Sequence, residues 1–136
     1  MSKLYTKLQA LLRDLNEFQH GSTGARYWLD LRCLILITHL YTEYLLEQLL
    51  IKHRFSETKA KREGFKWKIT ELKDKEIIDS VLYQELSRLN DARNAVGHNL
   101  NIIGKLAGID HYYLDMTSTK RKAAKLFEQL ANLVVA

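Results

Sequence analysis

An arginine and a histidine stand five positions apart in the segment RNAVGH, residues 93–98. The imidazole of His98, with an ordinary pKa near ~6.5, suits either a general acid or a general base at neutral pH. The guanidinium of Arg93 keeps its charge and stabilises negative charge that develops on oxygen atoms. Together the two residue types predict acid–base chemistry at an anionic centre such as a ribose-phosphate linkage.

Arg93 interrupts a stripe that is otherwise apolar. Residues at helical spacing around it share one face, and all the others are hydrophobic: Leu82, Leu86, Leu89, Val96 and Leu100. An arginine in this position must either reach water at an edge of the fold or be met by a carboxylate and further acceptors inside it.

The neighbouring face of the same predicted helix is rich in hydrogen-bonding side chains. They recur at intervals of three and four: Ser87, Asn90 or Asp91, Asn94, His98 and Asn101. A solvated helix face usually carries lysine and glutamate, so this composition predicts a site. We expect Asn94 to orient a phosphate or His98, and Asn90 to support the site.

A helix does not bring Arg93 and His98 to one face. Five positions at about 3.6 residues per turn separate them by about 140°, whereas Asn94 and His98 are aligned. Joint action therefore requires one of three arrangements. The helix ends or distorts near Gly97, the long Arg93 side chain wraps around it, or two copies of the chain bring their motifs together.

Composition predicts a single all-α domain spanning residues 1–136. The chain has no proline and only six glycines, with 46% apolar and 27% charged residues, which favours long helices. The lone Cys33 lies in an apolar run, which predicts a buried thiol in a reducing compartment and no zinc site built from paired cysteines.

No secretory signal or membrane segment is expected from the sequence. The first residues lack an apolar signal region, and no apolar run approaches the ~20 residues that span a bilayer. These features predict a soluble, cytoplasmic protein without membrane contact. The formal net charge of +5 is compatible with an anionic partner such as RNA but does not by itself indicate one.

Periodicity predicts about five helices with a long central second one. The expected helices cover residues 3–18, 25–55, a short third segment near 65–75, a fourth that begins at 77–80, and a last one after the N-cap candidates Thr117-Ser118-Thr119. Residues 56–64 form either the solvated start of the third helix or a loop. Residues 99–116 read as an irregular connection.

Glu43 and Glu47 stand inside the apolar second helix. Glu43 and Glu47 lie one turn apart, and a carboxylate on a central helix is costly unless it is paired. We expect Glu43, or failing it Glu47, to hold the guanidinium of Arg93. The alternative is that both face solvent or Lys52. His39, one turn before Glu43, is expected to pack rather than to act as a base.

Lysines alternate with aromatic residues in the third segment. The apolar residues Phe65, Trp67, Ile69 and Leu72 occur in one segment with four basic residues: Lys66, Lys68, Lys73 and Lys75. Such a pattern can stack bases and bind phosphates, or it can be an amphipathic helix whose lysines lie in water. A second basic cluster, residues 120–125, is either a phosphate-facing patch or a solvated face.

RNAVGH and the preceding LSRLNDA, residues 86–92, resemble the signature of the HEPN superfamily. In that family an arginine followed by a polar residue precedes a histidine near the end of a helix, and Arg93, Asn94 and His98 match this pattern. The resemblance implies a HEPN-like helical bundle, a homodimer and a metal-independent ribonuclease without cofactors. It also implies an acidic residue of the second helix in contact with the motif.

The leading hypothesis is an endoribonuclease that cleaves single-stranded RNA through attack of the 2′-hydroxyl. Arg93, His98 and Asn94 would form the catalytic group, with Glu43, Glu47 and Asn90 in support. The resemblance further suggests a toxin or anti-phage effector restrained by a cognate antitoxin such as a nucleotidyltransferase. The alternative is a non-catalytic dimeric module that binds RNA, a nucleotide or a protein.

Overall fold

The computed structural model describes residues 6, 9–10, 12–13, 24–98 and 116–136, with the backbone alone at 24–29, 97 and 98. The five named helices of the described chain are α2 (Gly24–Lys52), α3 (Glu57–Arg62), α4 (Phe65–Asp74), α5 (Ser80–His98) and α6 (Met116–Val135). All regular structure in these ranges is helical, which confirms the predicted all-α class.

The predicted helix boundaries agree with the structure to differing degrees. The long second and fourth helices are confirmed as α2 and α5. The polar segment at 56–64 forms α3, where the Lys59 amide donates to Ser56 Oγ at 3.1 Å and caps the helix. The last helix begins at Met116, so the predicted N-cap at 117–119 is wrong, because these residues already form its first turn. The predicted helix at 3–18 and the connection at 99–116 lie mostly outside the described residues.

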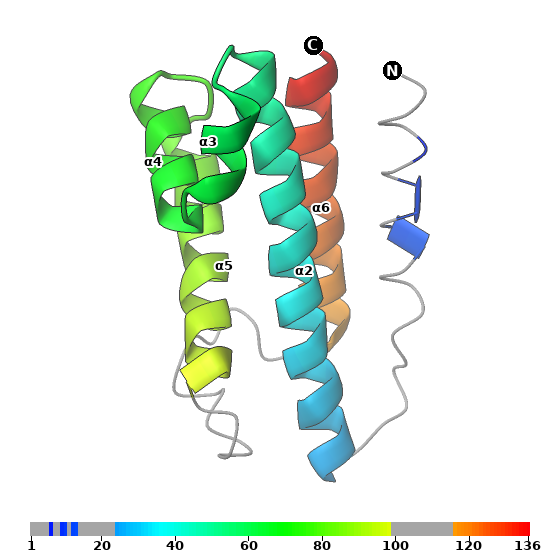
Figure 1. The fold of residues 1–136 in the computed structure, drawn as a ribbon. Helices are drawn as coiled ribbons and strands as arrows, with labels where there is room; N and C mark the ends of the chain where they lie inside the picture. The colour runs from blue at the N-terminus through cyan, green and yellow to red at the C-terminus, as the bar shows by residue number, and fades with distance from the viewer. Residues whose placement is uncertain (1–5, 7–8, 11, 14–23, 99–115) are drawn as a thin grey trace.

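The long second helix is central, as predicted. In Figure 1, α2 and α6 run in the same direction and α5 runs antiparallel to them, while α3 and α4 lie near the end of the bundle where α2 ends. α2 contacts every other named helix. Its buried residues form one core with those of α4, α5 and α6, including Leu34, Leu46, Leu49, Ile69, Leu86, Leu89, Phe127 and Leu130. The backbone of the motif is therefore carried by a helix anchored on the core.

The apolar character of α2 is compatible with a soluble bundle. By length and composition, the stretch Asp30–Lys52 is also apolar enough to cross a membrane, and half of its most apolar window is buried inside the fold. A core helix of a soluble bundle has the same properties.

One strip of α2 remains at the surface. Leu40 is 61% exposed and Leu36 is 36% exposed, one helical turn apart. Cys33, one turn before Leu36, is also exposed, so the predicted buried thiol is wrong. The sequence does not distinguish this strip from the residues of α2 that contact other helices, because both sets of residues are hydrophobic.

The turn between α4 and α5 places a non-glycine residue in the left-handed conformation. Glu76 has φ 60°, and its amide donates to the Lys73 carbonyl at 2.9 Å while the Ile77 amide donates to the Leu72 carbonyl at 2.9 Å. This pair of bonds is the Schellman motif, in which glycine normally occupies the position of Glu76. Arg54, φ 73°, adopts the same conformation after α2. These tight ends direct the chain into α3 and α5.

Because Glu76 lies in the left-handed region, Glu76→Gly should raise the free energy of unfolding by up to about 1 kcal/mol, since glycine adopts this conformation without steric cost. Lys75→Gly is the matched control: Lys75 has φ −89°, where glycine brings only an entropic loss, so stability should fall. Chemical denaturation of both variants checks the pair, and a loss of stability in Glu76→Gly would contradict the assignment.

Candidate functional site

Arg93 lies at an edge of the bundle. Its apolar neighbours on the stripe, Leu89 and Val96, are buried as predicted, whereas Arg93 itself is exposed. Its Nη1 donates to Asn94 Oδ1 at 3.5 Å, the long limit of a hydrogen bond. The structure therefore selects the first of the two options for this arginine, contact with water, and leaves its charge accessible.

The two glutamates of α2 bind a lysine of α4. Lys68 Nζ donates to Glu43 Oε2 at 2.9 Å and to Glu47 Oε2 at 2.8 Å. The Lys68 side chain is 1% exposed, whereas the two carboxylates are 27% and 17% exposed. The prediction that Glu43 or Glu47 holds Arg93 is therefore wrong for the single chain: among the described residues, the buried cation that these carboxylates neutralise is Lys68.

Burial of Lys68 follows from its position on α4. The buried side chains of this helix are Phe65, Lys68, Ile69 and Leu72, which recur at three- and four-residue spacing and form one face. The expectation that the lysines of this segment lie in water is thus wrong at Lys68. The signal was present in the sequence, because Lys68 interrupts an apolar stripe in the same way as Arg93.

His39 joins α2 to the motif helix. Its Nε2 lies 3.1 Å from Asn90 Oδ1, its side chain is 8% exposed, and its ring stacks on Phe65 with centroids 4.1 Å apart. His39 is therefore a packed histidine, as predicted. Asn90, predicted as a support of the motif, is held by His39.

Burial lowers the pKa of His39 below its usual value, and the hydrogen bond to Asn90 only partly opposes this effect. The charge of Glu43 acts in the same direction as that hydrogen bond, whereas the charges of Arg93 and Lys68 lower the pKa further. Burial therefore favours the neutral form of His39, and Arg93 lies close enough for its charge to lower this pKa further.

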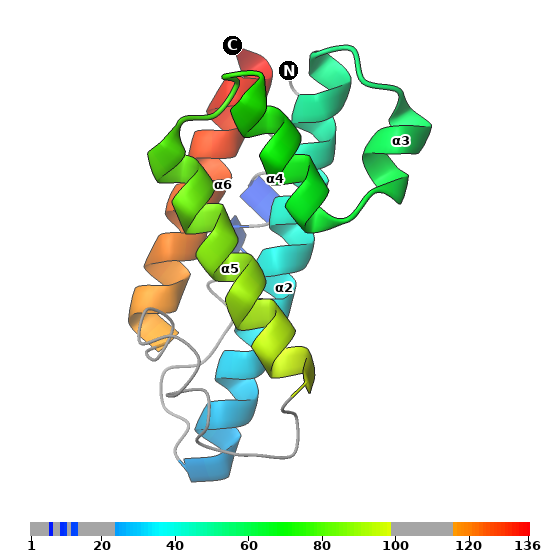
Figure 2. The ribbon, with the colours of Figure 1, turned by 90° about the vertical axis from the view of Figure 1, so that its left-hand side faces the viewer.

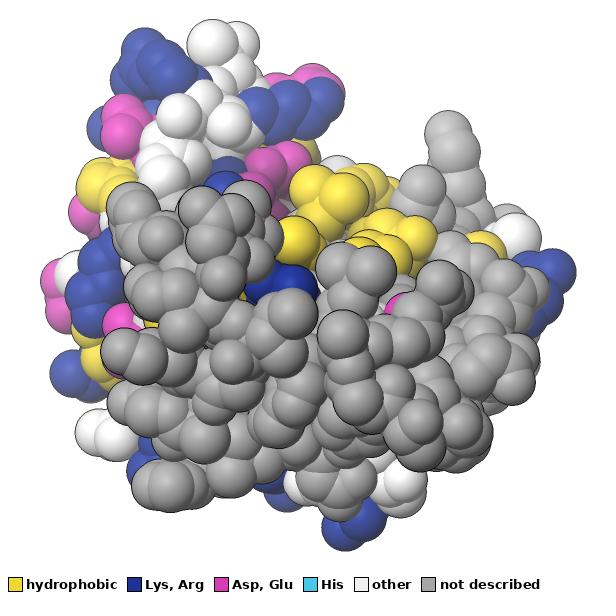
Figure 3. Space-filling model, turned by 90° about the horizontal axis from the view of Figure 1, so that it is seen from below, with side chains coloured by type: hydrophobic (Ala, Val, Ile, Leu, Met, Phe, Trp, Pro, Cys, Tyr) yellow, Lys and Arg dark blue, Asp and Glu magenta, His cyan; other side chains and the backbone are white. Residues whose placement is uncertain are grey.

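The polar residues form a buried part and an exposed part. His39, Glu43, Lys68 and Asn90 lie where α2, α4 and α5 meet, and Figure 2 shows α4 across the upper parts of the other two helices. Arg93 and its neighbour Asn94 are exposed further along α5. The end of the bundle where α5 stops also presents described hydrophobic side chains beside acidic and basic ones (Figure 3).

His98 is the last residue of α5, and its side chain lies outside the described part of the structure. The backbone is helical through Gly97, so α5 has no break before the histidine. The angular separation of about 140° between Arg93 and His98 therefore persists. Of the three arrangements that would allow joint action, a wrapped arginine and a pair of chains remain.

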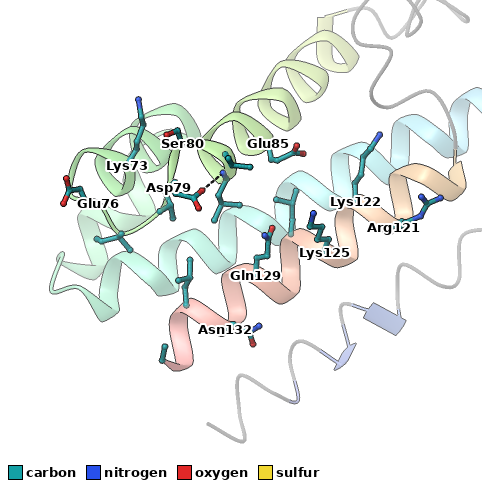
Figure 4. Close-up of a pocket in the computed structure, with 17 residues that line it drawn as sticks. Lys73, Glu76, Asp79, Ser80, Glu85, Arg121, Lys122, Lys125, Gln129 and Asn132 are labelled. Carbon is teal, nitrogen blue, oxygen red and sulfur yellow. Dashed lines mark hydrogen bonds between the residues drawn. The ribbon is translucent and has the colours of Figure 1, made fainter.

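A groove of about 1100 Å³ lies at the other end of α5. Figure 4 shows its lining from the end of α4, the start of α5 and one side of α6. The Leu82 amide donates to Asp79 Oδ1 at 2.8 Å at the start of α5, so a carboxylate already caps this helix. Glu85, the groove residue of α5 nearest to the motif in sequence, lies about 12 Å from Arg93 along the helix, and Arg93 does not line the groove.

No protein-family model matches this chain, and neither a curated protein nor a solved structure matches it. The functional interpretation therefore rests on the residues of the chain and on their arrangement. The sequence singled out Arg93, Asn94 and Asn90, and the structure adds His39 and Lys68 beside them.

Because the buried Lys68 forms ion pairs with two carboxylates, Lys68→Ala should lower the free energy of unfolding by about 3 kcal/mol. Lys68→Met combined with Glu43→Gln and Glu47→Gln should cost less than Lys68→Ala, because no uncompensated charge remains. Chemical denaturation compares the variants. Equal or greater destabilisation of the triple variant would contradict the role of this ion-pair cluster.

The lowered pKa of His39 predicts a pH dependence of stability. The unfolded chain binds a proton near pH ~6.5, whereas the folded chain takes it up only at lower pH. Stability from this group is therefore complete above pH ~6.5 and is lost as pH falls toward the folded pKa, by at most about 1.4 kcal/mol per pH unit. His39→Gln should flatten the dependence between pH 7.5 and 5.

Exposed His53 provides the matched control for that measurement. His53→Gln removes an imidazole from the surface and should leave the slope of unfolding free energy against pH as it is in the unmutated protein. A slope that survives in His39→Gln would show that other groups cause it.

Proposed function

We propose that this chain is a metal-independent endoribonuclease that cleaves single-stranded RNA, with Arg93, Asn94 and His98 as its catalytic residues. The observation that carries the proposal is the exposed guanidinium of Arg93 on the helix that ends at His98. An accessible permanent cation one to two turns before a histidine suits a phosphodiester substrate. The all-α bundle with a central α2 agrees with the expectation from the HEPN resemblance.

The proposed reaction uses the 2′-hydroxyl of RNA as the nucleophile. A base removes the 2′-hydroxyl proton, the 2′-oxygen forms a bond to the adjacent phosphorus, and the bond from phosphorus to the 5′-oxygen breaks as an acid protonates that oxygen. His98 serves as one of these proton-transfer groups. Arg93 stabilises the charge on the non-bridging oxygens, and Asn94 orients the phosphate. DNA lacks the nucleophile and is not cleaved.

A homodimer supplies both an acid and a base and removes the angular problem between Arg93 and His98. The exposed strip on α2 supports such an assembly, because Leu36 and Leu40 leave apolar area in water. The contact between His39 and Asn90 in antiparallel helices puts Leu36 about level with Arg93. A two-fold contact through this strip would bring the two motifs toward each other.

A second candidate function is a non-catalytic module that binds RNA, a nucleotide or a protein. It is favoured by the engagement of Glu43 and Glu47 with Lys68, because Arg93 then lacks the acidic support that the HEPN resemblance implies. For the catalytic form, the proposed setting is a cytoplasmic toxin or anti-phage effector with a nucleotidyltransferase-type antitoxin.

If the ribonuclease proposal holds, His98→Ala should lower the cleavage rate of single-stranded RNA by about 10²- to 10⁴-fold, because it removes a proton-transfer group. Arg93→Ala should lower it by about 10²- to 10³-fold through lost charge stabilisation. Gel assays with labelled RNA, with and without EDTA, measure the rates, and EDTA should have no effect.

Arg88→Ala is the matched control for Arg93→Ala, because Arg88 is an exposed arginine on the same helix. It should retain the unmutated rate. If the unmutated protein binds a broad panel of RNA substrates but cleaves none of them, the binding module replaces the ribonuclease.

A further inference from the structure

Two lysines of α4 converge on one tyrosine of α5. Lys66 Nζ lies 5.0 Å from the ring centroid of Tyr83 and Lys73 Nζ lies 4.8 Å from it. Lys66 Nζ also donates to the Tyr83 hydroxyl at 2.8 Å. This hydrogen bond is the main cause of a lowered pKa for the Tyr83 phenol, followed by the hydrogen bond with Thr70. We call Lys66, Lys73 and Tyr83 the lysine–tyrosine surface.

Lysines lie over aromatic rings in four pairs within the described residues. Two of these pairs are Lys66 and Lys73 with Tyr83, and the other two are Lys59 over Trp67 and Lys75 over Phe55. Within the described residues, Lys66 and Lys73 meet a ring rather than a carboxylate, so their charge stays available to a ligand.

The lysine–tyrosine surface lies on the polar stripe that leads to the motif. Tyr83 and Asn94 are eleven positions apart, which is about 20° around an ideal helix, with Ser87 and Asn90 between them. Tyr83 and Ser87 are half-buried and Asn94 is exposed, whereas the half-buried Asn90 belongs to the buried group of polar residues and is held by His39. The stripe therefore runs about 16 Å along α5, from Tyr83 to the neighbour of Arg93.

We propose that the lysine–tyrosine surface binds single-stranded nucleic acid and leads the strand along α5 to Arg93. The inference rests on the proposed function for the identity of the natural strand as RNA. Lys66 and Lys73 bind phosphates, and Tyr83 offers a ring on which a base stacks. An acidic peptide would use the two ammonium groups but not the ring, so a nucleic acid matches the surface more fully.

The length of the stripe fits this path. At an axial rise of ~3.4 Å per nucleotide in a stacked strand, about 16 Å corresponds to four or five nucleotides between Tyr83 and the motif. Binding through the backbone and base stacking does not require a 2′-hydroxyl. The surface should therefore bind single-stranded DNA as well as RNA, although the proposed chemistry cleaves RNA alone.

The test measures fluorescence anisotropy of a fluorescein-labelled twelve-residue oligo-dT, a probe that cannot be cleaved by 2′-hydroxyl attack. Lys66→Ala with Lys73→Ala should weaken binding at least tenfold in low salt and reduce the slope of log K against log salt by about 1.4, because two phosphate contacts are lost. The matched control is Lys59→Ala with Lys75→Ala, which removes the same charge and two cation–π lysines from other rings. It should bind nearly as the unmutated protein.

Substitutions of Tyr83 distinguish the contribution of base stacking to binding from that of charge. Tyr83→Leu should weaken binding about tenfold with little change in the salt slope, whereas Tyr83→Phe keeps the ring and should retain binding. Thermal melts followed by circular dichroism verify that each variant is folded. If a folded Tyr83→Leu variant binds the oligonucleotide as tightly as the unmutated protein, base stacking on Tyr83 does not contribute to binding.

Equal loss in the two double-lysine variants would overturn the proposal, because charge alone would then explain binding. Tighter binding of a poly-glutamate peptide than of the oligonucleotide would overturn it in favour of an acidic protein partner. Failure of the ribonuclease proposal is recognised separately, as absence of RNA cleavage by the unmutated protein. Selective binding loss in the Lys66 and Lys73 variant would support the surface in either case.

Discussion

The buried ammonium group of Lys68 constrains the arrangement of the helices around the motif. A charge in a position only 1% exposed is tolerated because Glu43 and Glu47 both accept hydrogen bonds from it at 2.8–2.9 Å. The cluster ties α4 to α2. It also engages Glu43 and Glu47, the two acidic side chains of α2 that were predicted to contact Arg93. Arg93 must then be satisfied elsewhere, and its exposed position at the edge of the bundle allows water to do so.

Docking of α4 extends this constraint to the motif helix. Phe65 precedes Lys68 by one turn and stacks on His39, and His39 bonds to Asn90 of α5. With the Asn90 amide oxygen facing the ring, the neutral imidazole carries its proton on Nε2. The hydrogen bond between His39 and Asn90 therefore joins α2 to α5. This contact also determines which part of α2 lies level with Arg93 and Asn94 of α5.

The sequence predicted the helices and their buried faces but not the partners of the buried polar groups. The stripes of α2, α5 and α6 were recognisable because apolar residues repeat at helical spacing. Lys68 also lies at helical spacing with the apolar residues of α4, but the other lysines of this helix make it hard to recognise as the one that faces the core. The pairing of Glu43 depends on how three helices are placed relative to one another. Periodicity along a single helix contains no such information, so Arg93 was as reasonable a partner as Lys68.

The division between buried and exposed polar residues bears on what the site can do. Lys68 is bound by both Glu43 and Glu47, so its ammonium group stabilises the fold and has little remaining capacity for a ligand, while the cluster keeps one negative charge in excess. Among the described residues, Arg93 makes only a long hydrogen bond to its neighbour Asn94, at 3.5 Å, and its side chain is exposed. A guanidinium in this state gains more from a phosphate than one already fixed by a carboxylate, because two parallel charge-assisted bonds replace water without breaking an ion pair. Because Glu43 and Glu47 bind Lys68 and not Arg93, the motif is better able to bind an anion than it would be with the predicted pairing.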